Sequence, residues 1–99
     1  MMNKRSKKPR NTELYEAILK LKTPEECICF FEDLCTRTEL LAMEQRFLVA
    51  RRLDSGMVYH DIFEETGASS ATISRVNRSL QYGSGGYATV FERLKEDEA

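Results

Sequence analysis

The sequence predicts an all-α fold of six helices, and three observations lead to it. Apolar residues recur at three- and four-residue spacing along most of the chain, as on one face of a helix. We find no segment with the alternating pattern of a β-strand and no internal repeat. A glycine at position 67 separates two short amphipathic segments. With 99 residues, the chain is expected to form one helical domain over residues 12–99, preceded by a basic arm at residues 1–11.

The first two helices are marked by caps and apolar faces. The first is expected to begin at Asn11 or Thr12, and its apolar face consists of Leu14, Ala17, Ile18 and Leu21. Thr23 and Pro24 open the second, with acids against its N-terminal dipole. Its apolar residues surround most of the helix: Cys27, Ile28, Phe30, Phe31, Leu34 and Cys35. A helix of this kind must be buried on more than one side.

A longer third helix and a final helix flank the glycine-centred turn. The third is expected from Thr38 to about Leu53, ending by Ser55-Gly56. A flexible glycine-rich break at residues 83–86 precedes the last helix. One face of that helix consists of Tyr87, Val90, Phe91 and Leu94.

Residues 58–81 predict a helix-turn-helix. Gly67 ends the first helix because glycine adopts a positive φ at little cost. Ser69 or Ser70 can cap the second helix by accepting a bond from a free backbone N–H. The residues expected on the inner faces are Ile62, Phe63, Ile73 and Val76.

The outward side chains of the second helix suit a DNA groove. They are Ser69, Ser70, Thr72, Ser74, Arg75 and Arg78. Hydroxyls bind phosphates and bases, and arginines bind guanine edges and phosphates. The alternative is a helical protein that never contacts DNA, because a glycine-stopped helix followed by a serine-capped one is common in such proteins.

Basic residues are concentrated at the N-terminus. Residues 1–10 hold five Lys or Arg and no acid, and because the whole chain has a net charge of −1, the remainder carries −6. The arm is either a tether for nucleic acid or a disordered solubility tail. The acidic remainder predicts that DNA affinity depends on a local positive face plus the arm, and falls steeply with salt.

Several functional classes are disfavoured. No apolar run approaches the roughly 18 residues of a membrane span, and no apolar stretch follows the first lysines as in a secretory signal. We therefore expect a cytoplasmic, bacterial-type protein. The single histidine, His60, has no nucleophile or facing carboxylate, so an enzyme is not expected.

The three cysteines, Cys27, Cys29 and Cys35, predict free thiols that are buried as small apolar residues. A zinc site is disfavoured, because residues two positions apart on a helix do not face each other. We expect no metal and no cofactor.

The apolar surface is large for so short a chain. Small domains bury only about 60–65% of their surface, and several of these helices are apolar on two sides. An interlocked homodimer would bury what a monomer leaves exposed. The alternative is a monomer with an unusually apolar surface.

Three segments carry a resemblance to a known family. They are Thr36-Arg37-Thr38-Glu39, Gly67-Ala68-Ser69-Ser70-Ala71-Thr72-Ile73-Ser74-Arg75 and Asn77-Arg78-Ser79-Leu80. The span that contains them resembles the Trp repressor family, most closely its YerC/YecD subgroup. The resemblance implies an intertwined homodimer whose two recognition helices enter successive major grooves of double-stranded DNA. By motif, Ser69, Ser70, Ala71 and Ser74 match DNA-contacting positions, and His60 falls near a backbone-contact position.

The same resemblance points to a ligand pocket. In the tryptophan-binding member of the family, the corepressor pocket occupies positions that match Thr36, Arg46, Thr72, Arg75, Val76 and Ser79. Val76 stands where that member has glycine. Its isopropyl group fills space that the indole would need, and overfilling a packed site costs about 1–3 kcal/mol. We therefore expect a vestigial pocket and no tryptophan corepressor, and leave another effector open.

Two functions remain. The first is a sequence-specific transcriptional regulator, expected to be a repressor because a simple dimer that covers DNA blocks polymerase. The alternative is a dimeric helical adaptor that has lost DNA binding, favoured by the acidic body and by a recognition helix with only two cations, Arg75 and Arg78. Salt-dependent binding to duplex DNA separates the two.

Overall fold

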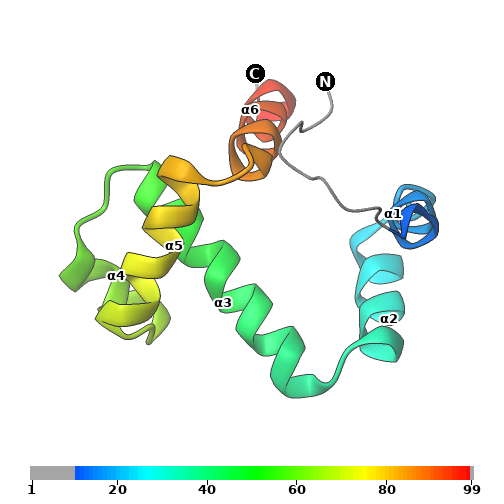
Figure 1. Cartoon of the computed structure of the whole chain (residues 1–99), viewed down its shortest axis with the longest axis horizontal. Helices are drawn as coiled ribbons and strands as arrows, with labels where there is room; N and C mark the ends of the chain where they lie inside the picture. Colours follow the sequence, from blue (N-terminus) through cyan, green and yellow to red (C-terminus); the bar gives the residue numbers. More distant parts are fainter. Residues whose placement is uncertain (1–10, 99) are drawn as a thin grey trace. The chain divides into compact units, whose positions relative to one another are not determined.

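The structure, a computed structural model, describes residues 11–98 and places six helices in them (Figure 1). The helices are α1 (Thr12–Ile18), α2 (Pro24–Leu34), α3 (Arg37–Asp54), α4 (Tyr59–Thr66), α5 (Ser70–Tyr82) and α6 (Gly86–Glu98). No strand occurs within the described residues. The predicted all-α fold is therefore confirmed. The basic arm falls almost wholly on residues 1–10, which lie outside the described part.

The chain divides into two compact units. The first ends at Leu41 and contains α1, α2 and the start of α3. The second begins at Ala42 and contains the rest of α3 with α4, α5 and α6. Helix α3 runs without a break from one unit into the other.

The first unit begins its helices where the capping residues predict. The Asn11 side chain accepts a hydrogen bond from the backbone N–H of Glu13 at 3.0 Å, and Thr23 Oγ1 accepts from that of Glu26 at 3.1 Å. Glu26 in turn accepts from the N–H of Lys22 at 2.8 Å, which closes the first turn of α2 reciprocally. Helix α1 is shorter than expected and ends at Ile18.

No residue between 11 and 41 is buried within this single chain. Large apolar side chains are exposed there, among them Leu19 at 82% and Tyr15 at 56%. The cysteines do not form the buried set that we expected: Cys29 is exposed, and Cys27 and Cys35 are half-buried. Burial of α2 on several sides is therefore not achieved by residues 11–98 of one chain.

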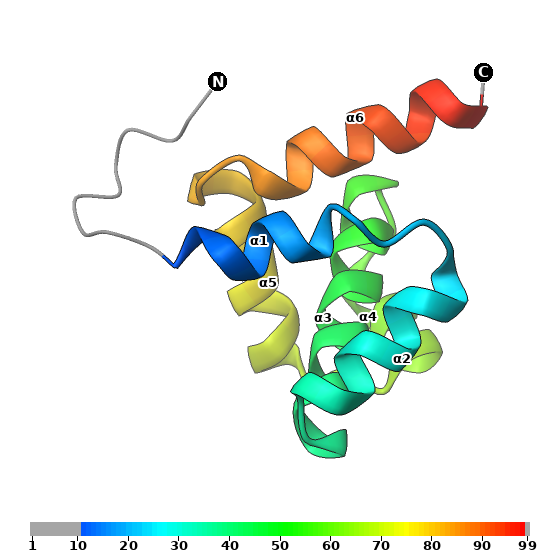
Figure 2. The ribbon, with the colours of Figure 1, turned by 90° about the vertical axis from the view of Figure 1, so that its right-hand side faces the viewer.

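The second unit contains a core of its own. Its buried residues are Val49 and Ala50 of α3, Ile62 of α4, Ala68 in the turn, Ile73 and Val76 of α5, and Phe91 of α6. Figure 2 shows α6 leaving the end of α5 at a steep angle. The ring of Phe91 stacks on Tyr87 and tilts against Phe47 of α3, with ring centroids 5.7 Å apart in both pairs.

Candidate nucleic-acid interface

Helices α4 and α5 form the predicted helix-turn-helix (Figure 1). Gly67 has φ 74°, the left-handed conformation that glycine adopts without a steric penalty, and its N–H donates to the Phe63 carbonyl at 2.8 Å. Ser69, not Ser70, caps α5, because its Oγ accepts from the Thr72 N–H at 3.1 Å. Ile73 and Val76 point inward as predicted and are almost fully buried.

The Thr66 side chain fixes the turn between the two helices. Its Oγ1 donates to the Ile62 carbonyl at 2.7 Å and accepts from the Ala68 N–H at 3.1 Å. Ala68 is 1% exposed, so its N–H has no access to water and needs this partner. One hydroxyl therefore joins the last turn of α4 to the residue that leads into α5.

Helix α3 holds the same turn from the other side. Gln45 Nε2 donates to the Thr66 carbonyl at 3.2 Å, and Arg52 Nε donates to Glu65 Oε2 at 2.5 Å. Both contacts connect residues that lie far apart in the sequence. None of these four residues is expected from the sequence to have a functional role.

Most of the predicted DNA-contacting side chains are exposed on the outer surface of the helix-turn-helix. The exposed ones are His60, Ser69, Ser70, Ala71, Ser74, Arg75 and Arg78. Thr72 is half-buried, and its Oγ1 accepts from Ser69 Oγ at 3.1 Å. The Ser69 hydroxyl therefore has a structural task in the cap as well as its predicted position for DNA.

Phe63 differs from the expectation. We expected it on the inner face of α4, but it is 49% exposed, whereas its neighbour Ile62 is fully buried. Two adjacent helical residues point about 100° apart, and in a helix of eight residues only one of them faces α5. Phe63 instead lines an open hollow together with Tyr59, His60, Ser69, Ser70 and Ile73.

The residues of the predicted ligand pocket differ in their exposure. Val76 is 3% exposed and belongs to the core of the second unit. Arg46, Arg75 and Ser79 are exposed. Thr36 forms the N-terminal capping box of α3, accepting from the Glu39 N–H at 3.1 Å, while Glu39 accepts from the Thr36 N–H at 2.8 Å. Helix α3 therefore begins at Arg37, one residue before the expected start at Thr38.

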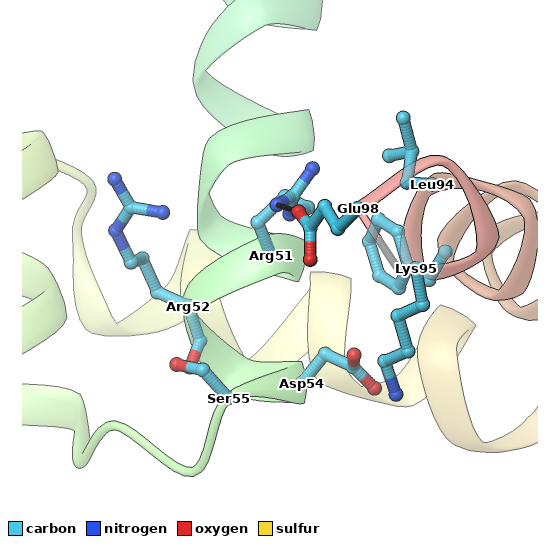
Figure 3. Close-up of a pocket in the computed structure, with 8 residues that line it drawn as sticks. Arg51, Arg52, Asp54, Ser55, Leu94, Lys95 and Glu98 are labelled. Atoms are coloured by element: carbon cyan, nitrogen blue, oxygen red, sulfur yellow. Dashed lines mark hydrogen bonds and ion pairs between the residues drawn. The ribbon is translucent and has the colours of Figure 1, made fainter.

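A second hollow, of about 290 Å³, lies between the end of α3 and α6. Figure 3 shows Arg51 pointing toward Glu98, to which it pairs at 4.0 Å, while Arg52 points away from both. The Arg51 guanidinium also lies 5.8 Å from the centre of the Phe91 ring. The charged residues around this hollow have both signs, which is typical of a solvated seam between helices.

Residues 11–98 contain no group of three or more His, Cys, Asp and Glu side chains that is arranged to hold a metal ion. No helix in this range is long and apolar enough to cross a membrane.

Comparison with known proteins identifies the family. Residues 10–95 match the family described as Trp repressor protein. The chain belongs to the Trp repressor family. This family consists of DNA-binding regulators and not of enzymes, which agrees with the solvent-exposed helix-turn-helix.

Individual relatives of the Trp repressor family support the assignment. The chain is 52% identical to protein YerC of Bacillus subtilis (strain 168) over 86 residues, which cover 87% of this chain and 83% of YerC. A crystal structure of a TrpR-like protein from Eubacterium eligens ATCC 27750 is 58% identical, with a TM-score of 0.80, and covers 84% of this chain and 86% of that one. A Trp-repressor-like structure from Staphylococcus aureus is 48% identical with the same TM-score, covering 84% and 83%. The YerC subgroup resemblance is therefore confirmed.

Proposed function

We propose that this protein is a sequence-specific, DNA-binding transcriptional regulator that acts in the cytoplasm as a homodimer. The observation that carries the proposal is the exposed outer surface of α5, whose hydroxyls and two arginines suit the major groove. Membership of a family of DNA-binding regulators supports it. A dimer that covers its site excludes polymerase without further domains, so we propose a repressor.

The support for a homodimer is the exposed apolar surface of the first unit. Helices α1 and α2 contain no buried residue, although α2 carries six apolar side chains. Exposed apolar surface of this extent marks an interaction site. A second copy of the chain would bury it, and a two-fold dimer would present its recognition helices to half-sites roughly 34 Å apart.

We further propose that DNA binding does not need tryptophan. The matching member of the family has glycine where this chain has Val76, and here that side chain is buried in the core. An occupied position leaves no room for an indole ring. Another small-molecule effector remains compatible with this proposal.

The decisive experiment is a selection of random duplex DNA against the full chain at moderate salt, with and without tryptophan. We expect enrichment of one nearly palindromic site, unchanged by tryptophan. Enrichment only in the presence of tryptophan would refute the proposal on Val76. No enrichment in either condition would favour the adaptor, for which the acidic body with net charge −6 is the supporting observation.

Variants assign the contacts within this experiment. Ser74→Ala and Arg75→Ala should weaken binding to the selected site more than to random duplex, and equal losses would remove both from base recognition. Deletion of residues 1–10 should weaken binding. It should also reduce the slope of log K against log salt concentration by a few units, because fewer counterions are released on binding. An unchanged salt slope would make the arm a tail only.

A further inference from the structure

The hollow between α4 and the start of α5 is lined by aromatic, hydroxyl and aliphatic side chains. Its volume is about 370 Å³, and its lining residues are Tyr59, His60, Phe63, Ser69, Ser70 and Ile73. None of them is Asp, Glu, Lys or Arg. The hollow between α3 and α6, in contrast, is lined by five such residues. This surface is therefore suited to an uncharged, partly apolar group.

The aromatic residues at this hollow are exposed without a structural reason in the single chain. Phe63 is 49% exposed and Tyr59 is 39% exposed, and neighbouring Val58 is 60% exposed. Ile73, which also lines the hollow, is 1% exposed and belongs to the core. Large apolar side chains that are exposed together beside a buried core residue mark a binding surface.

The position of the hollow limits what occupies it. Ser69 and Ser70 form its rim, and they continue along α5 into the exposed face that carries Ser74 and Arg75. Short side chains at Ser69, Ser70 and Ala71 allow a base edge to approach the helix closely. The rings of Tyr59 and Phe63 and the side chain of Ile73 present carbon to the hollow, so its interior suits an apolar group better than a phosphate. Among the four bases, thymine alone presents an apolar group in the major groove, its 5-methyl.

We propose that this hollow is a base-recognition subsite that receives the 5-methyl group of a thymine, with Phe63 and Tyr59 as the apolar contacts. The proposal rests on the proposed DNA-binding function and names one base that it reads. Phe63 and Tyr59 are then specificity-determining residues. Contact with a methyl group also adds the apolar discrimination that serine hydroxyls, which pair with several bases, do not supply.

The test replaces single thymines of the selected site by deoxyuridine, which removes only the methyl group and leaves the protein unchanged. We expect one thymine in each half-site to be sensitive, with binding weakened about fourfold per methyl removed. In Phe63→Ala, the ratio of the affinities for the thymine and deoxyuridine sites should fall toward one. Val90→Ala removes a similarly exposed apolar side chain from α6 and should keep the preference. Circular dichroism checks that both variants are folded.

The possible results distinguish failure of the thymine subsite from failure of the proposed DNA-binding function. If the full chain binds its selected site and no deoxyuridine substitution weakens binding, the subsite is refuted while the DNA-binding function stands. A thymine preference that survives both Phe63→Ala and Tyr59→Ala places the methyl contact elsewhere and also refutes it. If no duplex is bound at all, the proposed function fails, and the subsite fails with it. A sensitive thymine whose preference disappears in Phe63→Ala supports the proposal.

Discussion

Gln45 Nε2 and the carbonyl oxygen of Thr66 lie 3.2 Å apart and form a part-buried hydrogen bond between α3 and the end of α4. Two helical turns further along α3, on the same face, Arg52 contacts Glu65, the residue before Thr66. Helix α3 therefore holds two consecutive residues at the end of α4. Together with the core, these contacts position the helix-turn-helix within the second unit.

Gln45→Ala should lower the free energy of unfolding by about 1 kcal/mol, because a side chain-to-backbone hydrogen bond contributes about that much and the Thr66 carbonyl would lose its partner from α3. Chemical denaturation followed by circular dichroism measures it. Glu44→Ala changes an exposed neighbour on the same helix and should have little effect. Equal stability of the two variants would show that the Gln45 contact is dispensable.

Thr66→Val should be more damaging than its small change of shape suggests. The variant loses the bond to the Ile62 carbonyl and leaves the buried N–H of Ala68 without its acceptor. An unsatisfied buried donor costs about 1–3 kcal/mol. This corresponds to a fall in Tm of several degrees for a domain of this size. Thr38→Val, at an exposed position of α3, is the matched control and should leave Tm nearly unchanged.

The Arg52–Glu65 pair should contribute only a few tenths of a kcal/mol to stability. About a third of each side chain is exposed, 32% and 39%, so water and salt screen the charges. A double-mutant cycle with Arg52→Met and Glu65→Gln isolates the coupling energy, and added salt should reduce it. A coupling well above 1 kcal/mol that resists salt would contradict this assignment.

Val76→Gly should destabilise the protein by about 3 kcal/mol, through a cavity in the core and the weaker helix propensity of glycine. If Val76 occupies the place of an indole, tryptophan should restore part of the lost Tm in this variant and none in the unaltered protein. Val49→Ala removes volume elsewhere in the same core and should show no response to tryptophan. Identical behaviour of both variants toward tryptophan would refute a pocket at this position.

The sequence predicts the features of this fold that depend on local chemistry. Gly67, the cap at Ser69 and the inward Ile73 are set by residues within a few positions of one another, so their pattern suffices. The capping box of Thr36 and Glu39 has an equally local signature, threonine followed three residues later by glutamate. The expected start at Thr38 is late because it was placed from the apolar face of α3, which begins after this capping box.

The features that sequence analysis missed depend on distant partners. Gln45 binds a backbone carbonyl 21 residues away, and a carbonyl leaves no mark in the sequence. Phe63 was expected inside because its apolar character gives no direction, and only the packing of α4 decides between it and Ile62. The exposure of Cys29 has the same origin, because nothing among residues 11–98 of one chain covers that part of α2.

The uneven distribution of buried residues has a consequence for how the protein responds to its own abundance. Within residues 11–98, all seven buried core residues lie in the second unit, so this unit can fold as a single copy. Helices α1 and α2 contain no buried core residue. In the proposed dimer, the extent to which α1 and α2 are structurally ordered depends on protein concentration, because dimerisation follows mass action. Dilution would then remove paired half-site binding and the ordering of α1 and α2, while the helix-turn-helix would stay folded, because the folding of a single copy does not depend on protein concentration. If the protein is the dimeric repressor proposed above, a cell with few copies would contain folded monomers that cannot bind paired half-sites, and repression would begin only above a threshold of expression.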